Sequence, residues 1–128
     1  MCEKKYYVCE VCGNIVEKVH DSGNELMCCM RTMQELEAGT TDGKVEYHIP
    51  VCKLKHNELK VKIGKEPHPM EDKHYIQWVS VITDKGEMRK YLKPGDEPEV
   101  CFHLCDDEKV CEIYAYCNLH KLWKLKIE

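Results

Sequence analysis

The second two-thirds of the chain alternates apolar and polar residues in short runs separated by turn residues. "ELKVKIG" (58–64) places Leu59, Val61 and Ile63 on one face and lysines on the other, as in a strand with one buried face. "HYIQWVSVIT" (74–83) is rich in aromatic and β-branched residues, which predicts a strand buried on both faces. Further runs of this kind are 44–54, 86–92, 99–105, 110–117 and 122–127.

Seven short strands with turns such as "TDKGE" and "KPGDEP" between them predict an antiparallel β-sandwich. No helical period is sustained, and "MRTMQEL" (30–36) allows one turn of helix at most. "EAGTTDGK" (37–44) is typical of a linker. We therefore expect a mainly β protein with two domains, a small one in residues 1–36 and a sandwich in residues 37–128.

Composition places the chain among globular proteins without a nucleic-acid or membrane partner. Of its 128 residues, 33% are charged and 43% apolar, and the net charge of −4 argues against a nucleic-acid-binding surface. No apolar run approaches the ~20 residues that a membrane span requires. The start, "MCEKKYYVCE", lacks the apolar stretch of a secretory signal, so we expect a cytoplasmic protein.

Ten cysteines in a chain without a secretory signal favour thiolate metal ligands over disulfides. Cys9 and Cys12 form a Cys-x2-Cys knuckle, and Cys28 and Cys29 are adjacent in sequence. Four thiolates suit a tetrahedral zinc or iron ion, and the adjacent pair should strain its local backbone. A metal would also explain how a segment with almost no apolar core folds. Reduced structural thiols and a purely structural zinc site remain open alternatives.

The segment "YVCEVCGNIVEKVHDSGNELMCCMRTMQEL" resembles the desulforedoxin-type domain, a small rubredoxin-type metal domain at the N-terminus of desulfoferrodoxin. The resemblance covers the whole segment, including the adjacent cysteines. It implies a mononuclear tetrahedral iron bound by Cys9, Cys12, Cys28 and Cys29.

Four histidines lie in phrases that distinguish them from ordinary packed or solvated histidines. They are "EYHIP" with His48, "KEPHPM" with His68, "DKHYIQW" with His74 and "YCNLHKLW" with His120. Prolines on both sides of His68 stiffen its loop. In the last phrase Cys117 precedes the histidine by three residues, a spacing found in many metal sites.

In order and spacing, these phrases resemble the catalytic domain of superoxide reductase. The whole chain thus resembles the two-iron, desulfoferrodoxin type of that enzyme, which implies an immunoglobulin-like sandwich and a second iron. The resemblance implies four equatorial imidazoles, an axial thiolate and an open sixth position, supplied by His48, His68, His74, His120 and Cys117.

The chain departs from the family phrase Glu-Lys-His, because it has Glu46-Tyr47-His48. The resemblance implies that Glu46 binds the oxidised iron at the open position, and that the absent lysine would attract superoxide and assist protonation. Tyr47 is either a core residue, as strict alternation favours, or a proton relay. Lys121 stands where the family often has glycine, and we hypothesise that it, with Lys73, supplies the missing charge. A solvated lysine is the alternative.

The resemblance implies an oxidoreductase that reduces superoxide to hydrogen peroxide with electrons from a rubredoxin-like donor, as a homodimer. The N-terminal iron would relay electrons or serve as a structural unit. A non-catalytic electron-transfer or metal-binding protein on the same scaffold is the alternative function. Zinc could occupy the same ligands but could not supply an electron.

The remaining cysteines and histidines have no role that the resemblance assigns. We interpret the cysteines as plain thiols, with a disulfide or a third metal site as alternatives, and the histidines as non-ligands. They are Cys2, Cys52, Cys101, Cys105 and Cys111, and His20, His56 and His103.

Overall fold

The structure is a computed structural model that describes residues 4–39 and 43–127. The chain divides into two compact units, a small one of residues 3–37 and a larger one that begins at residue 38. The described residues include no helix with the length and apolar character that a membrane crossing needs.

The small unit consists of short antiparallel strands around a minimal core. Its three-stranded sheet has the order β2-β1-β5, and a separate hairpin pairs β3 with β4. The strands are β1 Tyr6–Val8, β2 Ile15–Glu17, β3 Met27–Cys28, β4 Arg31–Thr32 and β5 Gln34–Leu36. The turn of helix allowed for residues 30–36 is wrong, because this segment pairs as β4 and β5, for example Glu35 opposite Tyr7.

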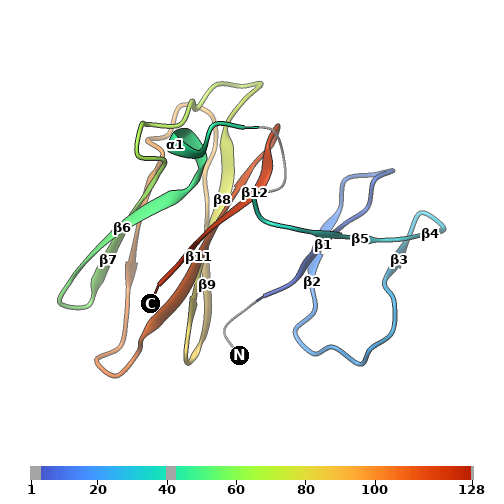
Figure 1. Ribbon diagram of the computed structural model, residues 1–128, viewed down its shortest axis with the longest axis horizontal. Helices are drawn as coiled ribbons and strands as arrows, with labels where there is room; N and C mark the ends of the chain where they lie inside the picture. Colours follow the sequence, from blue (N-terminus) through green and yellow to red (C-terminus); the bar gives the residue numbers. More distant parts are fainter. Residues whose placement is uncertain (1–3, 40–42, 128) are drawn as a thin grey trace. The chain divides into compact units, whose positions relative to one another are not determined.

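The larger unit contains the seven strands that the alternation predicts, in two antiparallel sheets (Figure 1). One sheet has the order β10-β7-β6 and the other β12-β11-β8-β9. The strands are β6 Pro50–Lys55, β7 Glu58–Ile63, β8 Ile76–Thr83, β9 Gly86–Tyr91, β10 Glu99–His103, β11 Val110–Cys117 and β12 Lys121–Lys126. The prediction of a mainly β, antiparallel fold is therefore confirmed.

The core lies between the two sheets. In β7 the inward residues Leu59, Val61 and Ile63 are almost completely buried, while the lysines between them are exposed. They pack with inward residues of β10, β8 and β11, which include Phe102 and Ile113. β8 is buried on both of its faces, as its aromatic and β-branched sequence predicts.

Residues 44–54 do not form the single strand that their alternation predicts. A short helix, α1 (Val45–His48), precedes β6. The backbone groups of this segment find partners in the loop after β7: Glu66 N–H donates to Glu46 O at 2.8 Å, and Gly64 N–H to Ile49 O at 3.2 Å. These hydrogen bonds to a distant loop take the place of bonds to a neighbouring strand. The first part of the segment therefore forms no strand, although its apolar and polar residues alternate.

Gly64 allows the chain to turn back toward α1 at the end of β7. Its φ is +84°, and a Cβ there would lie 2.5 Å from the carbonyl oxygen of Tyr47 and would also collide with that of Glu66. Both obstacles are backbone atoms that a rotamer change cannot move. Only glycine fits this position without displacing α1 or the loop.

We predict that Gly64→Ala destabilises the larger unit by roughly 3 kcal/mol or more, because a left-handed conformation and a backbone collision both oppose the methyl group. Gly95→Ala is the matched control, since Gly95 also has a positive φ of 92° but nothing lies within 4 Å of its Cβ position. The control should cost only about 1–2 kcal/mol. Urea unfolding followed by tryptophan fluorescence reports on this unit, which holds both tryptophans. Equal losses in the two variants would contradict the collision.

Candidate metal centres

Four cysteines of the small unit converge on one point. The Sγ atoms of Cys9, Cys12, Cys28 and Cys29 all lie within 4.8 Å of one another. The Cys12 and Cys28 sulfurs are 3.6 Å apart, and those of Cys28 and Cys29 are 4.0 Å apart. Four sulfurs at these separations can close around one tetrahedral ion.

Two tight turns bring the four sulfurs together. In the first, Gly13, with φ of +84°, lets the chain reverse, and its N–H donates to Cys9 O at 2.8 Å. In the second, Cys29 and Met30 connect β3 to β4 with φ of 52° and 63°, the two successive positive values that a type I′ hairpin turn requires. The backbone strain expected at the adjacent cysteines is therefore present at Cys29.

Hydrogen bonds within the cluster shift the pKa values of its thiols in opposite directions. The backbone N–H of Cys12 lowers the pKa of Cys9 to about 6. Hydrogen bonding to Cys12, then to Cys9 and Cys28, raises the pKa of Cys29 to about 12, and hydrogen bonding to Cys9 and Cys12 raises the pKa of Cys28. The cluster without an ion therefore retains protons, which a metal would displace while it neutralises the thiolates.

In the larger unit, four imidazoles form a square. Neighbouring ring centroids are separated by 4.7 Å (His48–His68), 4.7 Å (His68–His74), 5.1 Å (His74–His120) and 4.7 Å (His120–His48). The diagonal from His48 to His74 is 6.4 Å, close to that of a square with these sides. Neighbouring rings stand nearly perpendicular, at 74–89°. The four rings surround one central point.

The ring nitrogens face this centre. His48 Nε2 lies 3.0 Å from His120 Nδ1 and 3.2 Å from His68 Nε2. His74 Nε2 is buried and has no hydrogen-bond partner in the described part of the chain. A buried nitrogen without a partner is costly unless a ligand satisfies it. This orphaned nitrogen, together with the short distances between nitrogens, shows that the donor set fits a metal ion.

Outer hydrogen bonds fix which nitrogen faces inward. His48 Nδ1–H donates to Lys44 O at 2.7 Å, and His68 Nδ1–H donates to Pro69 O at 2.6 Å. The Nε2 lone pairs are thereby left free for a metal. Burial lowers the pKa of His48, His68 and His74, that of His68 to about 4. These imidazoles are therefore neutral at neutral pH, the form that binds metals.

A single buried thiol accompanies the square. Cys117 is fully buried at the end of β11, and its Sγ lies 3.8 Å from His120 Nδ1. The pairing of β11 with β8 shifts register between Tyr116 and Cys117, an irregularity that re-aims side chains beside many sites. Burial raises the pKa of Cys117, while hydrogen bonds from the backbone at His120 and Leu119 oppose this rise.

Asn118 was missed in the sequence, although it lies inside "YCNLHKLW". Its Oδ1 accepts from Tyr75 N–H at 2.9 Å, and its Nδ2–H donates to Lys73 O at 3.0 Å. Its backbone N–H also donates to Tyr75 O at 3.1 Å. These three bonds hold the segment that carries His74 against the turn that carries Cys117 and His120. The sequence offers one signal for Asn118: an amide side chain in the short turn between the candidate ligands Cys117 and His120.

Gly43 and Trp123 also shape the site. A Cβ on Gly43 would lie 3.0 Å from Trp123 Cζ2, 3.1 Å from His48 Cε1 and 3.2 Å from His120 Cβ. Trp123 stacks on His48 with centroids 4.7 Å apart, and its Nε1–H donates to His120 O at 2.9 Å. The indole thus supports two of the imidazoles, and glycine leaves the room for this packing.

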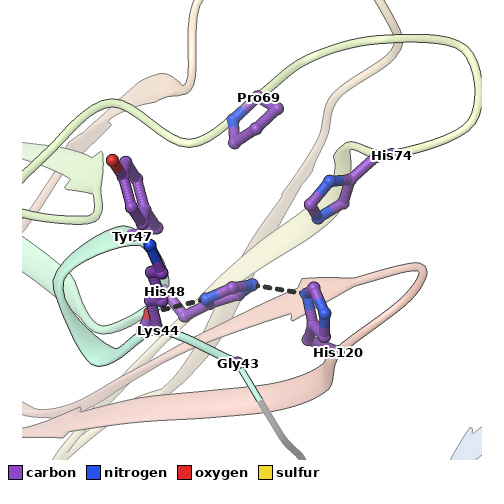
Figure 2. A pocket seen from close by; sticks show the side chains of 7 residues that line it. All are labelled: Gly43, Lys44, Tyr47, His48, Pro69, His74 and His120. Carbon is purple, nitrogen blue, oxygen red and sulfur yellow. Dashed lines mark hydrogen bonds between the residues drawn. The ribbon is translucent and has the colours of Figure 1, made fainter.

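An open pocket of about 380 Å³ reaches the imidazoles (Figure 2). Its described lining contains His48, His74 and His120, together with Gly43, Lys44, Tyr47 and Pro69. Cys117 is not part of this lining, so the pocket approaches the square from a side other than that of the thiol.

Of the polar residues considered for the open side of the site, Tyr47 lines the pocket, whereas Glu46 and Lys121 do not. Tyr47 is half-buried and lines the pocket, and its ring extends away from the three histidines drawn in Figure 2. Lys44 is the lysine in the described lining, and its Nζ lies 5.9 Å from the Tyr47 ring centroid. Glu46 and Lys121 are exposed, and neither side chain is part of the lining.

The remaining cysteines do not all stay free. Cys52, Cys101 and Cys105 are free thiols, as expected. Cys111 is disulfide-bonded, so its interpretation as a plain thiol is wrong. Cys2 lies outside the described residues.

Both parts of the chain match families of known proteins. A family model described as "Desulfoferrodoxin, N-terminal domain" matches residues 2–36, and one described as "Desulfoferrodoxin" matches residues 40–126. The chain is 48% identical over 118 residues to a desulfoferrodoxin homolog of Archaeoglobus fulgidus, which covers 92% of this chain and 93% of that protein. It is 45% identical to the desulfoferrodoxin of Nitratidesulfovibrio vulgaris, with 92% of each chain covered.

Solved structures give the same result. The superoxide reductase from Treponema pallidum has a TM-score of 0.81 and 35% identity, with 97% of this chain and 99% of that chain covered. A one-iron superoxide reductase from Giardia intestinalis has a TM-score of 0.56 and 36% identity, and covers 65% of this chain but 98% of its own. With both family models matched along almost the whole sequence, the chain belongs to the desulfoferrodoxin family.

Proposed function

We propose that this protein is a superoxide reductase, which reduces superoxide with one electron and two protons to hydrogen peroxide. The observation that carries the proposal is a square of four imidazoles beside one buried thiol, with an open pocket against the imidazoles. The similarity to superoxide reductases of known structure supports the same activity.

We assign two irons to the chain. One would be held by the four cysteine sulfurs of the small unit, and the other by the imidazoles of His48, His68, His74 and His120 with the Cys117 thiolate. The iron in the second site would supply the electron and an open coordination position for a small anion. A rubredoxin-like protein is the proposed electron donor, and a homodimer the proposed assembly.

The protein residues prepare the site for that iron and for its substrate. The hydrogen bonds that Nδ1–H of His48 and His68 donate to Lys44 O and Pro69 O keep Nε2 of both rings unprotonated and aimed at the centre. The sulfur of Cys117 is shielded from solvent and would donate electron density to a metal held there. Asn118 hydrogen-bonds the segment of His74 to the turn of Cys117, which fixes the positions of these ligands relative to one another.

Lys44 supplies positive charge at the pocket. Lys44 is among the residues that line the cavity and Lys121 is not, so we assign the attraction of superoxide to Lys44. The pocket is open to solvent and large enough to let a diatomic anion reach the imidazoles. Glu46 and Tyr47, both on α1, remain the proposed groups for binding the oxidised metal and for relaying protons.

A non-catalytic electron-transfer protein is the second candidate function. The four-thiol cluster of the small unit favours it, because such a site has no ligand position left for a substrate. The open pocket beside the histidines favours catalysis in the larger unit, since an electron-transfer site does not require access for a second molecule.

The activity is tested by mixing the reduced, iron-loaded protein with a pulse of superoxide. We expect one hydrogen peroxide for each superoxide consumed, one oxidised iron at the histidine site, and no release of dioxygen. Pulse radiolysis with peroxide and oxygen assays measures all three quantities. Dioxygen formed at half the amount of superoxide consumed would indicate dismutation, and superoxide that persists would favour the electron-transfer function.

We predict that Cys117→Ser removes the sulfur-to-iron absorption band of the histidine site and slows superoxide reduction by about tenfold or more. The serine oxygen is a harder, weaker donor and leaves the four imidazoles in place. Cys105→Ser is the control, because Cys105 is an exposed free thiol. A band that survives in Cys117→Ser would show that this sulfur does not bind the metal.

We predict that Lys44→Ala lowers the rate constant with superoxide by about three- to tenfold at low ionic strength and flattens its dependence on salt. Lys126→Ala makes the same change of charge at an exposed position at the far end of β12 and should leave the rate unchanged. Lys121→Ala, measured in parallel, decides between the two lysines. A loss in Lys121→Ala with none in Lys44→Ala would reverse our assignment.

A further inference from the structure

Three side chains with metal-binding groups meet on the outer face of the β10-β7-β6 sheet. They are Glu58 at the start of β7, and Cys101 and His103 on β10. Their ligand atoms, one carboxylate oxygen, one sulfur and one imidazole nitrogen, all lie within 4.8 Å of one another. None of them belongs to the two centres described above.

The strand register creates this cluster. His103 lies directly opposite Glu58 in the antiparallel ladder, and Cys101, two residues earlier, projects from the same face. The ladder is closed at this end, because Leu104 N–H donates to Asn57 O at 2.8 Å. Two neighbouring strands in fixed register therefore hold the three groups, rather than a loose loop.

The three groups have no competing partners. No ion pair joins Glu58, and no side-chain hydrogen bond joins Cys101 or His103, within residues 4–39 and 43–127. Two nearby lysines have other partners: Lys60 pairs with Glu99 at 3.8 Å, and Lys90 Nζ donates to the backbone oxygen of Cys101 at 2.5 Å. A third, Lys55, lies opposite Glu58 on β6. Glu58 and Cys101 thus remain available to an ion from solvent.

We propose that Glu58, Cys101 and His103 form a third metal site, which binds a divalent ion of the zinc class with water as the fourth ligand. A thiolate, an imidazole and a carboxylate are the three ligand types that zinc accepts in tetrahedral sites. Bond lengths of 2.0–2.3 Å place such ligands roughly 3.3–3.8 Å apart, which small rotations from the present positions can reach. Two anionic ligands balance the charge of the ion and limit its repulsion by Lys55, which lies opposite Glu58 on β6.

The third site is remote from the histidine square. It lies at the start of β7, whereas the loop that carries His68 follows the end of that strand, roughly 17 Å away along six residues. Figure 1 places the β6–β7 hairpin at the end of the sandwich opposite α1. An ion here would tie the edge strand β10 to β7 without contact with the ligands of the histidine site.

The test uses the full-length, iron-loaded protein, two equivalents of Zn²⁺, removal of unbound metal by gel filtration, and elemental analysis of both metals. We expect about one retained zinc for each chain with no loss of iron. Cys101→Ser and His103→Gln should each lower retained zinc at least about tenfold at limiting Zn²⁺, and Glu58→Gln should weaken it less.

Cys105→Ser, which changes an exposed thiol outside the cluster, should retain zinc as the parent protein does. Iron content and the visible spectrum show that each variant is folded, because both depend on the intact metal centres. The proposal would be overturned if the parent protein retained no zinc, or if Cys101→Ser and His103→Gln retained as much zinc as the parent protein. A gain of zinc matched by a loss of iron would overturn it as well.

Discussion

The metal site of the larger unit depends on one constraint: the ring nitrogens of four histidines face one another in a largely buried space. Nε2 of His48 lies 3.0 Å from Nδ1 of His120 and 3.2 Å from Nε2 of His68, and Nε2 of His74 has no partner among the described residues. Such an arrangement costs free energy unless a cation lies among the nitrogens. The turn at Gly64, the space at Gly43 and the register shift before Cys117 all hold this arrangement in place.

The small unit depends on a metal for a different reason. Its strands are two or three residues long, and its buried apolar residues are few. A core of this size supplies little hydrophobic free energy, so a tetrahedral ion would take the place that packed side chains have in larger domains. In the larger unit the sandwich has its own core, and the metal ligands lie at one end of it.

Much of the fold could be predicted from the sequence, because its physical cause is local. Alternation in 58–64 fixed which residues of β7 are buried, and β-branched and aromatic residues marked β8 as buried on both faces. The prediction failed at 44–54, where hydrogen bonds from Gly64 and Glu66 favour α1 over a strand. Asn118 and Gly43 were missed for the same reason, since their contacts join segments that are distant in sequence. The phrases around the histidines indicated the candidate ligands only through their resemblance to a family.

The hydrogen bonds of Asn118 have a consequence for how this protein can vary. One side chain joins the turn after β11, which carries Cys117 and His120, to the segment before β8, which carries His74. Residues inserted between 117 and 121 would displace three ligand positions at once. In the described part of the chain, no side-chain hydrogen bond joins the turn of the β6–β7 hairpin, at the opposite end of the sandwich, to the histidine square. Length variation among related chains should therefore be tolerated at that hairpin and excluded from the turn after β11.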